Sequence, residues 1–191
     1  LANVVAQQEA APIPAPAPSQ EEFDEYEPYV EPVFEEGVQG AIRIARPFPT
    51  RKHPDFPKVQ VLNTLFGGFF GSRLMTNIRE DKGYTYGIHS YVQNHIHDSA
   101  WMISTEAGKD VCEATIEEVY KEMKILREEL VSEDELKLVK NYVLGGLLGD
   151  LDGPFQIIAR WKSYILNDLT DAYFYNTKHY FYQLTIRRCC F

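Results

Sequence analysis

The sequence predicts an α+β fold in which helices pack on one face of an antiparallel sheet. Apolar and polar residues alternate in several segments of the first half, which predicts strands. The second half instead repeats apolar residues at helical steps of three and four, and no internal repeat is visible. Strands first and paired helices later favour helices gathered on one side of a sheet.

The first 36 residues differ from the rest in composition. "APIPAPAPS" alternates proline with small residues, and the acidic run "EEFDEYEPYVEPVFEE" follows it. We therefore expect a proline-rich acidic linker at residues 1–36 and a single domain at residues 37–191. Residues 1–42 contain nine acidic side chains and no lysine or arginine, so the net charge of -9 arises there. The remainder is neutral, which argues against nucleic-acid binding.

Other features narrow the class of protein. No apolar run approaches the ~18 residues of a membrane span, and no signal sequence follows Leu1. We expect a fragment or a processed product, and the compartment, cytoplasmic or periplasmic, stays open. The cysteines do not make a disulfide framework, since two of the three are adjacent. They are Cys112, Cys189 and Cys190.

The first elements follow from local patterns. "GAIRIARPF" places Ile42 and Ile44 on one face, which predicts a strand over about 39–47. "PDFPKVQVLNTLF" carries an apolar stripe at helical spacing and predicts a helix over 54–66. A pair of glycines that begins at Gly67 ends this helix.

A second short helix and a hairpin are predicted next. "GSRLMTNIRED" predicts a helix over 71–81, with Ser72 in a capping position at its start and Gly83 as a C-cap. "YTYGIHSYVQN" and "SAWMISTEA" predict strands over 84–94 and 99–107, and the short segment between them predicts a hairpin turn.

The second half predicts helices. Ser132 and Glu135 form a capping-box pattern that begins a helix, and Pro154 precedes another helix over 155–166. A last helix is expected from about Thr170. The helix before Ser132 is predicted from an amphipathic stripe. The stripe comprises Cys112, Ile116, Val119, Met123, Leu126 and Leu130.

The histidines offer one weak metal hypothesis. His95 and His97 are two apart in the predicted turn, with Asp98 as a third candidate ligand, but a solvated turn is the favoured interpretation. No two-histidine, one-glutamate helix motif of a zinc peptidase occurs in the sequence, so we expect no zinc in this chain. The other histidines stand alone and are assigned to the surface or to packing: His53, His89 and His179.

Arg79 and Tyr86 are the candidate catalytic residues. Arg79 lies in the last turn of the predicted helix and Tyr86 in the next strand, so both can point past one edge of the sheet. Two such donors that converge on one oxygen would stabilise an oxyanion. In the alternative, Arg79 neutralises the helix terminus and Tyr86 packs in the core. Tyr84 is predicted on the same face as Tyr86, so spacing does not choose between the tyrosines.

The stretch "LNTLFGGFFGSRLMTNIREDKGYTYGIHS" resembles the signature of the second, non-zinc half of the insulinase/pitrilysin-like metallopeptidases, or inverzincins. The order of elements from Gly37 to about Tyr180 is similar as well. In that family two α+β halves face each other like a clamshell. One half carries the inverted zinc motif with a water-activating glutamate, and the other supplies an arginine and a tyrosine. The tail "YQLTIRRCCF" stops short of the family's pattern, so we expect a truncated or altered end.

The resemblance implies a role for this chain. Arg79 and Tyr86, rather than Tyr84, would bind the scissile carbonyl and its tetrahedral intermediate. Zinc would come from a partner half or subunit, and none would be bound by this chain, which alone would be inactive. The substrate would be a peptide added to a sheet edge as an extra strand. A non-catalytic scaffold of a processing-peptidase-like complex is the alternative.

Overall fold

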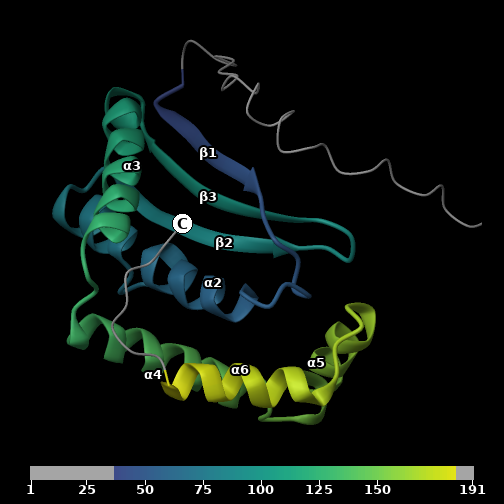
Figure 1. The fold of residues 1–191 in the computed structure, drawn as a ribbon. Coiled ribbons are helices and arrows are strands. Elements are labelled where there is room, and N and C mark those ends of the chain that lie inside the picture. Colours follow the sequence, from purple (N-terminus) through teal and green to yellow (C-terminus); the bar gives the residue numbers. More distant parts are fainter. Residues whose placement is uncertain (1–36, 184–191) are drawn as a thin grey trace, which may run out of the picture. The chain divides into compact units, whose positions relative to one another are not determined.

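The computed structural model describes residues 37–183, and this part has the predicted α+β architecture (Figure 1). The predicted linker, residues 1–36, and the end of the chain, residues 184–191, lie outside the described residues. Three antiparallel strands form a sheet, and helices pack against one of its faces (Figure 1). Within the described part, no helix is both long and apolar enough to cross a membrane.

The sheet has the strand order β1-β3-β2. Its strands are β1 (Gln39–Pro47), β2 (Thr85–Asn94) and β3 (Ser99–Gly108), so the predicted strands are confirmed to within a residue. β3 is the central strand and runs antiparallel to both neighbours. On β1, Ile42 is buried against the helices and Arg43 lies on the opposite face, as strand alternation requires.

The register between β2 and β3 shifts near the start of β2. Thr85 pairs with Ala107, whereas Ile88 pairs with Thr105. Two residues of β2 therefore lie opposite one residue of β3, and Tyr86 is one of the two. This irregularity is a β-bulge, which re-aims side chains and increases the local twist of the strand.

The predicted helix over 54–66 is two helices of different geometry. α2 (Phe56–Asn63) is α-helical, and η2 (Thr64–Gly68) has the wider π-helical turn. A side chain at Gly67 would place its Cβ 2.7 Å from the Cβ and 2.8 Å from the backbone nitrogen of Ser90 on β2. The glycine therefore permits close contact between η2 and the sheet.

The next helix, η3 (Met75–Asp81), is also π-helical, and it follows two α-helical residues, Arg73 and Leu74. The predicted cap by Ser72 is wrong, because its hydroxyl is buried and has no hydrogen-bond partner among the described residues. The predicted C-cap is confirmed. Gly83 adopts a φ of 65°, and its N–H donates to the carbonyl of Arg79 at 3.2 Å.

A 3-10 turn, η4 (Lys109–Val111), leads into α3 (Cys112–Glu128). Val119 and Leu126 of α3 are fully buried in the core. The predicted apolar stripe is wrong at two members. Ile116 is 36% exposed, and Leu130 lies beyond the helix and is 60% exposed. The helix ends before Leu130 because the backbone becomes extended at Glu129.

The last three helices are α4 (Glu133–Gly149), α5 (Pro154–Leu166) and α6 (Asp171–Gln183). α4 and α6 lie side by side, below α2 in the view of Figure 1. The predicted cap of α4 is confirmed, because the N–H of Glu135 donates to the Ser132 hydroxyl at 3.2 Å.

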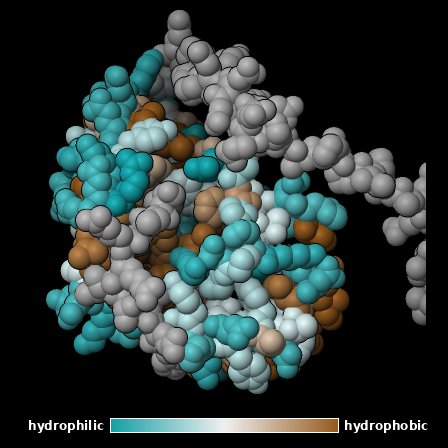
Figure 2. Space-filling model, in the orientation of Figure 1, coloured by the Kyte–Doolittle hydropathy of each residue, from teal (hydrophilic) through white to brown (hydrophobic). Residues whose placement is uncertain are grey.

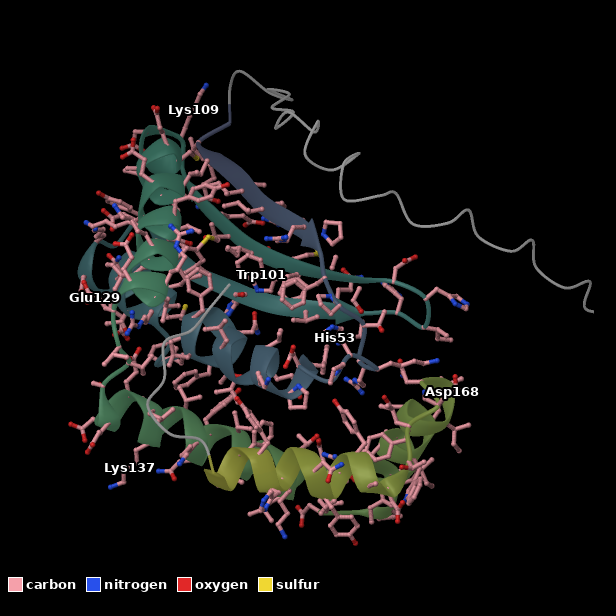
Figure 3. All side chains as sticks on the ribbon, in the orientation of Figure 1. His53, Trp101, Lys109, Glu129, Lys137 and Asp168 are labelled. Atoms are coloured by element: carbon pink, nitrogen blue, oxygen red, sulfur yellow. The ribbon has the colours of Figure 1, made fainter. Side chains whose placement is uncertain are left out.

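One hydrophobic core joins the sheet to the helices. Trp101 reaches from β3 toward α2 (Figure 3), and its indole N–H lies 2.9 Å from Asn63 Oδ1 and 2.8 Å from the Ser90 hydroxyl. Its ring packs on Phe66 at a centroid distance of 5.7 Å. The fully buried members of the core include Phe66, Leu74, Ile78, Ile88, Ile103, Val119 and Leu126.

Apolar side chains are also exposed on α5. They include Phe155, Ile158, Trp161 and Ile165. Figure 2 shows brown, hydrophobic atoms at the lower right, where Figure 1 places this helix. The amphipathic pattern of α5 therefore has a second apolar side that the described part of the chain leaves open to solvent.

Candidate functional site

The two predicted catalytic residues lie at one sharp corner between η3 and β2. We call residues 79–86 the Arg79–Tyr86 corner. The left-handed backbone of Gly83 turns the chain, and the N–H of Tyr84 then donates to the carbonyl of Ile78 at 3.1 Å. A non-glycine residue would be strained at this φ, so the glycine is what makes the turn tight.

Contacts on several sides hold the guanidinium of Arg79. Its Nε donates to the backbone carbonyl of Tyr86 at 2.9 Å. Its Cζ lies 4.6 Å from the centroid of the Phe70 ring, a cation–π contact. Its Nη1 is 3.8 Å from the Glu80 carboxylate. The side chain keeps 35% of its surface exposed, so the end of the guanidinium fork remains accessible.

Tyr86 is 91% exposed, which excludes the alternative that it packs in the core. Tyr84 does pack against the core. The prediction that both tyrosines share a face is therefore wrong. The reason is that Tyr84 precedes β2, and the bulge after Thr85 interrupts the alternation of side chains.

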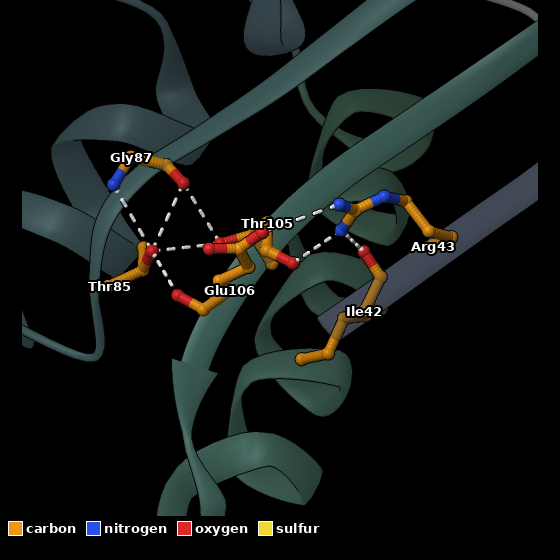
Figure 4. Close-up of polar contacts among 6 residues, drawn as sticks. All are labelled: Ile42, Arg43, Thr85, Gly87, Thr105 and Glu106. Atoms are coloured by element: carbon orange, nitrogen blue, oxygen red, sulfur yellow. Dashed lines mark hydrogen bonds and ion pairs between the residues drawn. The ribbon is translucent and has the colours of Figure 1, made fainter. Parts of the chain in front are cut away.

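Two threonine hydroxyls satisfy the backbone of the bulge (Figure 4). Thr85 Oγ1 lies 2.7 Å from the Glu106 carbonyl oxygen and accepts the N–H of Gly87 at 3.1 Å. Thr105 Oγ1 lies 2.9 Å from the Gly87 carbonyl oxygen and 2.8 Å from Thr85 Oγ1. Because these residues flank Tyr86, the network fixes the backbone that carries the exposed ring.

Arg43 joins the first strand to the same region (Figure 4). Its Nη1 donates to the carbonyls of Thr105 at 2.8 Å and Ile42 at 2.9 Å. Its Nη2 lies 3.6 Å from the Glu106 carboxylate. A charged side chain thus bridges β1 and β3 at the level of the bulge.

Helix α3 holds the other side of the corner through Glu118. Lys82 forms an ion pair with Glu118 at 2.7 Å, and the Asn77 amide donates to the same carboxylate at 3.1 Å. The hydrogen bond from Lys82 is the main reason that the pKa of Glu118 falls to about 2, while partial burial opposes the change. The carboxylate therefore stays ionised through the acidic range.

The histidine turn does not form a metal cluster. His95 and His97 are exposed, and the N–H of His95 donates to the carbonyl of Asp98 at 2.9 Å, which closes the β2–β3 turn. Over residues 37–183, no group of three His, Cys, Asp or Glu side chains is placed to hold a metal ion. The residues of this part of the chain do not fit a zinc ion.

Several residues of the site were not singled out from the sequence. They include Phe70, Thr85, Thr105 and Glu118. Phe70 lies in the glycine-rich run "GGFFGSR", and a 59% exposed phenylalanine between helix breaks is a signal for a surface role. The threonines carry no such signal, because ordinary strand propensity explains them.

Residues 2–143 match the family described as the peptidase M16 inactive domain. The chain belongs to this family of peptidase domains. The match confirms the resemblance to the non-zinc half of the insulinase/pitrilysin-like metallopeptidases. Among curated proteins, the chain is 28% identical over 100 residues to YmxG of Bacillus subtilis (strain 168), named an uncharacterized zinc protease. This alignment covers 52% of the chain and 24% of YmxG.

Solved structures share the fold. A peptidase M16 inactive domain from Pseudomonas fluorescens superposes with a TM-score of 0.71 at 23% identity, over 78% of this chain and 36% of that one. A protease from Helicobacter pylori gives a TM-score of 0.72 at 16% identity, over 80% of this chain and 37% of that one. The chain thus spans about a quarter of its curated relative and somewhat more than a third of these structures.

Proposed function

We propose that this chain is the substrate-carbonyl-binding half of a zinc metalloendopeptidase, with Arg79 and Tyr86 as the donors to the scissile carbonyl. The observation that carries the proposal is the geometry of the corner. Arg79 is anchored on the carbonyl of Tyr86 at 2.9 Å, while the Tyr86 ring is 91% exposed and free to meet a substrate.

The chemistry of amide hydrolysis calls for such donors. Attack on the carbonyl places negative charge on its oxygen, and preorganised donors stabilise that charge more than they stabilise the bound substrate. The guanidinium of Arg79 is permanently charged and offers a planar set of N–H groups. Its contacts with Tyr86 and Phe70 hold it in place before substrate binds, so little reorganisation is needed.

The zinc ion and the group that activates water are assigned to a partner half-domain or subunit. We expect zinc and the water-activating glutamate on a second half-domain or subunit, because residues 37–183 offer no metal cluster. The chain alone would then cleave no peptide, which agrees with the family's description as an inactive domain. Residues 37–191 would form the domain, and residues 1–36 would link it to a preceding part of the parent protein.

The test uses the assembled two-half enzyme. Tyr86→Phe removes one donor and keeps the ring, and Arg79→Lys keeps the charge but loses the planar fork. Each change should lower kcat about 100–1000-fold, the loss of roughly 2.7–4 kcal/mol typical of one oxyanion donor. Zinc content and Tm should stay as in the parent. Tyr91→Phe, on the same strand and also exposed, is the control and should leave kcat unchanged.

A non-catalytic scaffold role predicts that these substitutions leave kcat almost unchanged. If Tyr86→Phe and Arg79→Lys both keep kcat within about twofold of the parent, the pair is structural. A non-catalytic scaffold role would then replace the proposed one.

A further inference from the structure

A second site candidate lies away from the corner, where α2, α4, α5 and α6 meet. It is a pocket of about 830 Å³, in the size range of sites for small organic molecules. None of its lining residues belongs to the Arg79–Tyr86 corner. We call it the helical pocket. Its apolar lining includes Val143, Leu147, Tyr164 and Phe181.

Residues whose buried polar atoms lack hydrogen-bond partners line the helical pocket. Five buried side-chain nitrogen or oxygen atoms lack a hydrogen-bond partner among the described residues, and four of them belong to residues that line this pocket. The four are Arg51 Nε, Arg160 Nε, the Tyr173 hydroxyl and the Thr177 hydroxyl. Thr177 is 94% buried on the helix face that lines the pocket, with 6% of its surface exposed. Unpaired buried polar atoms are costly, so their concentration in one place points to a missing partner.

The two arginines are held in position by neighbouring groups. Arg160 donates to the Tyr164 hydroxyl at 2.8 Å and pairs with Asp150, and its guanidinium lies 5.1 Å from the Phe174 ring centroid. Arg51 donates to the Ser163 hydroxyl at 2.5 Å. No ion pair joins Arg51 to a carboxylate within residues 37–183, so its charge is not neutralised by direct contact there.

The positive charges of Arg51 and Arg160 both influence the pKa of Tyr173. Burial raises the pKa of Tyr173, whereas the charge of Arg51, the nearby Thr177 hydroxyl and the charge of Arg160 oppose this rise. The net pKa is raised, so the hydroxyl keeps its proton at neutral pH and can donate it. Next to Arg51 in the sequence, Lys52 pairs at 2.5 Å with Asp168, which lies at the turn between α5 and α6.

We propose that the helical pocket binds a small organic carboxylate with an apolar body. Arginine N–H groups can only donate, so the partner that the Nε atoms of Arg51 and Arg160 lack must be an acceptor. An anion also matches the charge of Arg51, which no carboxylate of residues 37–183 neutralises. The hydroxyls of Tyr173 and Thr177 add two further donors for the same group. The aliphatic and aromatic lining fits an apolar body. A peptide with a free C-terminal carboxylate and a fatty acid both carry this chemistry.

The binding test uses the full 191-residue chain and isothermal titration calorimetry. The probes are decanoate and a short apolar peptide, the peptide either with a free C-terminal carboxylate or as its amide. We expect saturable binding of at least one carboxylate, and at least about tenfold weaker binding of the amide than of the matched acid. Binding of decanoate alone would assign a lipid-like source, and binding of the peptide acid alone would assign a peptide terminus. No saturable binding, or equal binding of acid and amide, would overturn the proposal.

Two variants separate binding from folding. Arg51→Gln should weaken the carboxylate about tenfold or more, whereas Arg127→Gln on the exposed side of α3 should not. Thr177→Val keeps the shape and removes an unpartnered buried hydroxyl, so the ligand-free chain should have an equal or higher Tm while its carboxylate affinity falls. If Thr177→Val and Arg51→Gln both bind as the Arg127→Gln control does, the site is not where we place it.

Discussion

At the scale of single residues, two threonine hydroxyls determine the position of Tyr86. The bulge interrupts regular pairing between β2 and β3, so its backbone groups need other partners. Thr85 and Thr105 supply these partners, as the network around Gly87 shows. Valine is a similar shape and also favours strands, but it offers no hydrogen bond.

Thr85→Val should therefore lower the free energy of unfolding by about 1–3 kcal/mol, because the Gly87 N–H loses its acceptor in a partly buried place. Urea denaturation of the chain at pH 7 measures the change. Thr85→Ser keeps the hydroxyl and is the control. It should lower the free energy of unfolding less than Thr85→Val does. A Thr85→Val protein as stable as the parent would show that solvent replaces these hydrogen bonds without cost.

The sequence predicted that Arg79 and Tyr86 lie at one corner, but not which contacts hold that corner. The spacing of Arg79 and Tyr86 around a glycine turn placed both at one corner, and the structure joins them through a hydrogen bond. Alternation alone could not separate Tyr84 from Tyr86, because alternation assumes an unbroken strand. A bulge depends on the partner strand, and no local pattern in the sequence specifies that partner.

At the scale of helices and strands, one close contact defines the interface between η2 and β2. The backbone of Gly67 approaches Ser90 so closely that any Cβ would collide with it. Asn63 strengthens the same interface, because its side-chain amide donates to the Ser90 carbonyl at 3.0 Å. The end of α2 and the turn of η2 are thereby fixed on the sheet.

Gly67→Ala should destabilise the chain by about 1–3 kcal/mol, since the added methyl group forces η2 away from the backbone of Ser90. Gly145→Ala is the matched control. Gly145 is exposed in α4 with nothing within 4 Å of its Cβ position, so alanine should stabilise the chain by about 0.5–1 kcal/mol. Thermal unfolding followed by circular dichroism measures both. Equal Tm values for the two variants would contradict the close contact.

Periodicity predicted the regular elements well because each buries one apolar face. The strands and α3 were predicted from such faces, whereas the starts of α4 and α5 were predicted from a capping box and a proline. The π-helical turns of η2 and η3 were not predicted, since their width follows from contacts with β2 rather than from local propensity. The cap at Ser72 failed for a similar reason: packing turns its hydroxyl into the core.

At the scale of the whole molecule, long-range polar contacts join elements that the sequence keeps far apart. Arg51 and Ser163 are hydrogen bonded although 112 residues separate them, and nothing local predicts that contact or the helical pocket around it. Glu118 acts similarly at the corner, where it connects α3 to Lys82 and Asn77.

Stability in acid should depend on Glu118. Its pKa is lowered from 4.5 to about 2 in the folded chain, so its contribution is complete above about pH 4.5 and is lost as the pH falls toward 2. Glu118→Gln should thus lower the free energy of unfolding by about 1–2 kcal/mol at pH 7, after allowance for solvent screening. The difference from the parent should shrink between pH 4.5 and 2. Urea denaturation across this range tests it, with the exposed Glu117→Gln as control.

The central place of β3 has a consequence for amide hydrogen exchange. β3 pairs along its length with β1 on one side and with β2 on the other. Within the described residues, β1 and β2 are the outer strands, and each pairs with β3 on one side only. Successive amides of β3 therefore point alternately into two ladders, and deuterium reaches them only when the sheet itself opens. Exchange should be slowest around Ile103 and faster at alternate positions of the two outer strands. The slowest amides then report the free energy of opening the domain as a whole.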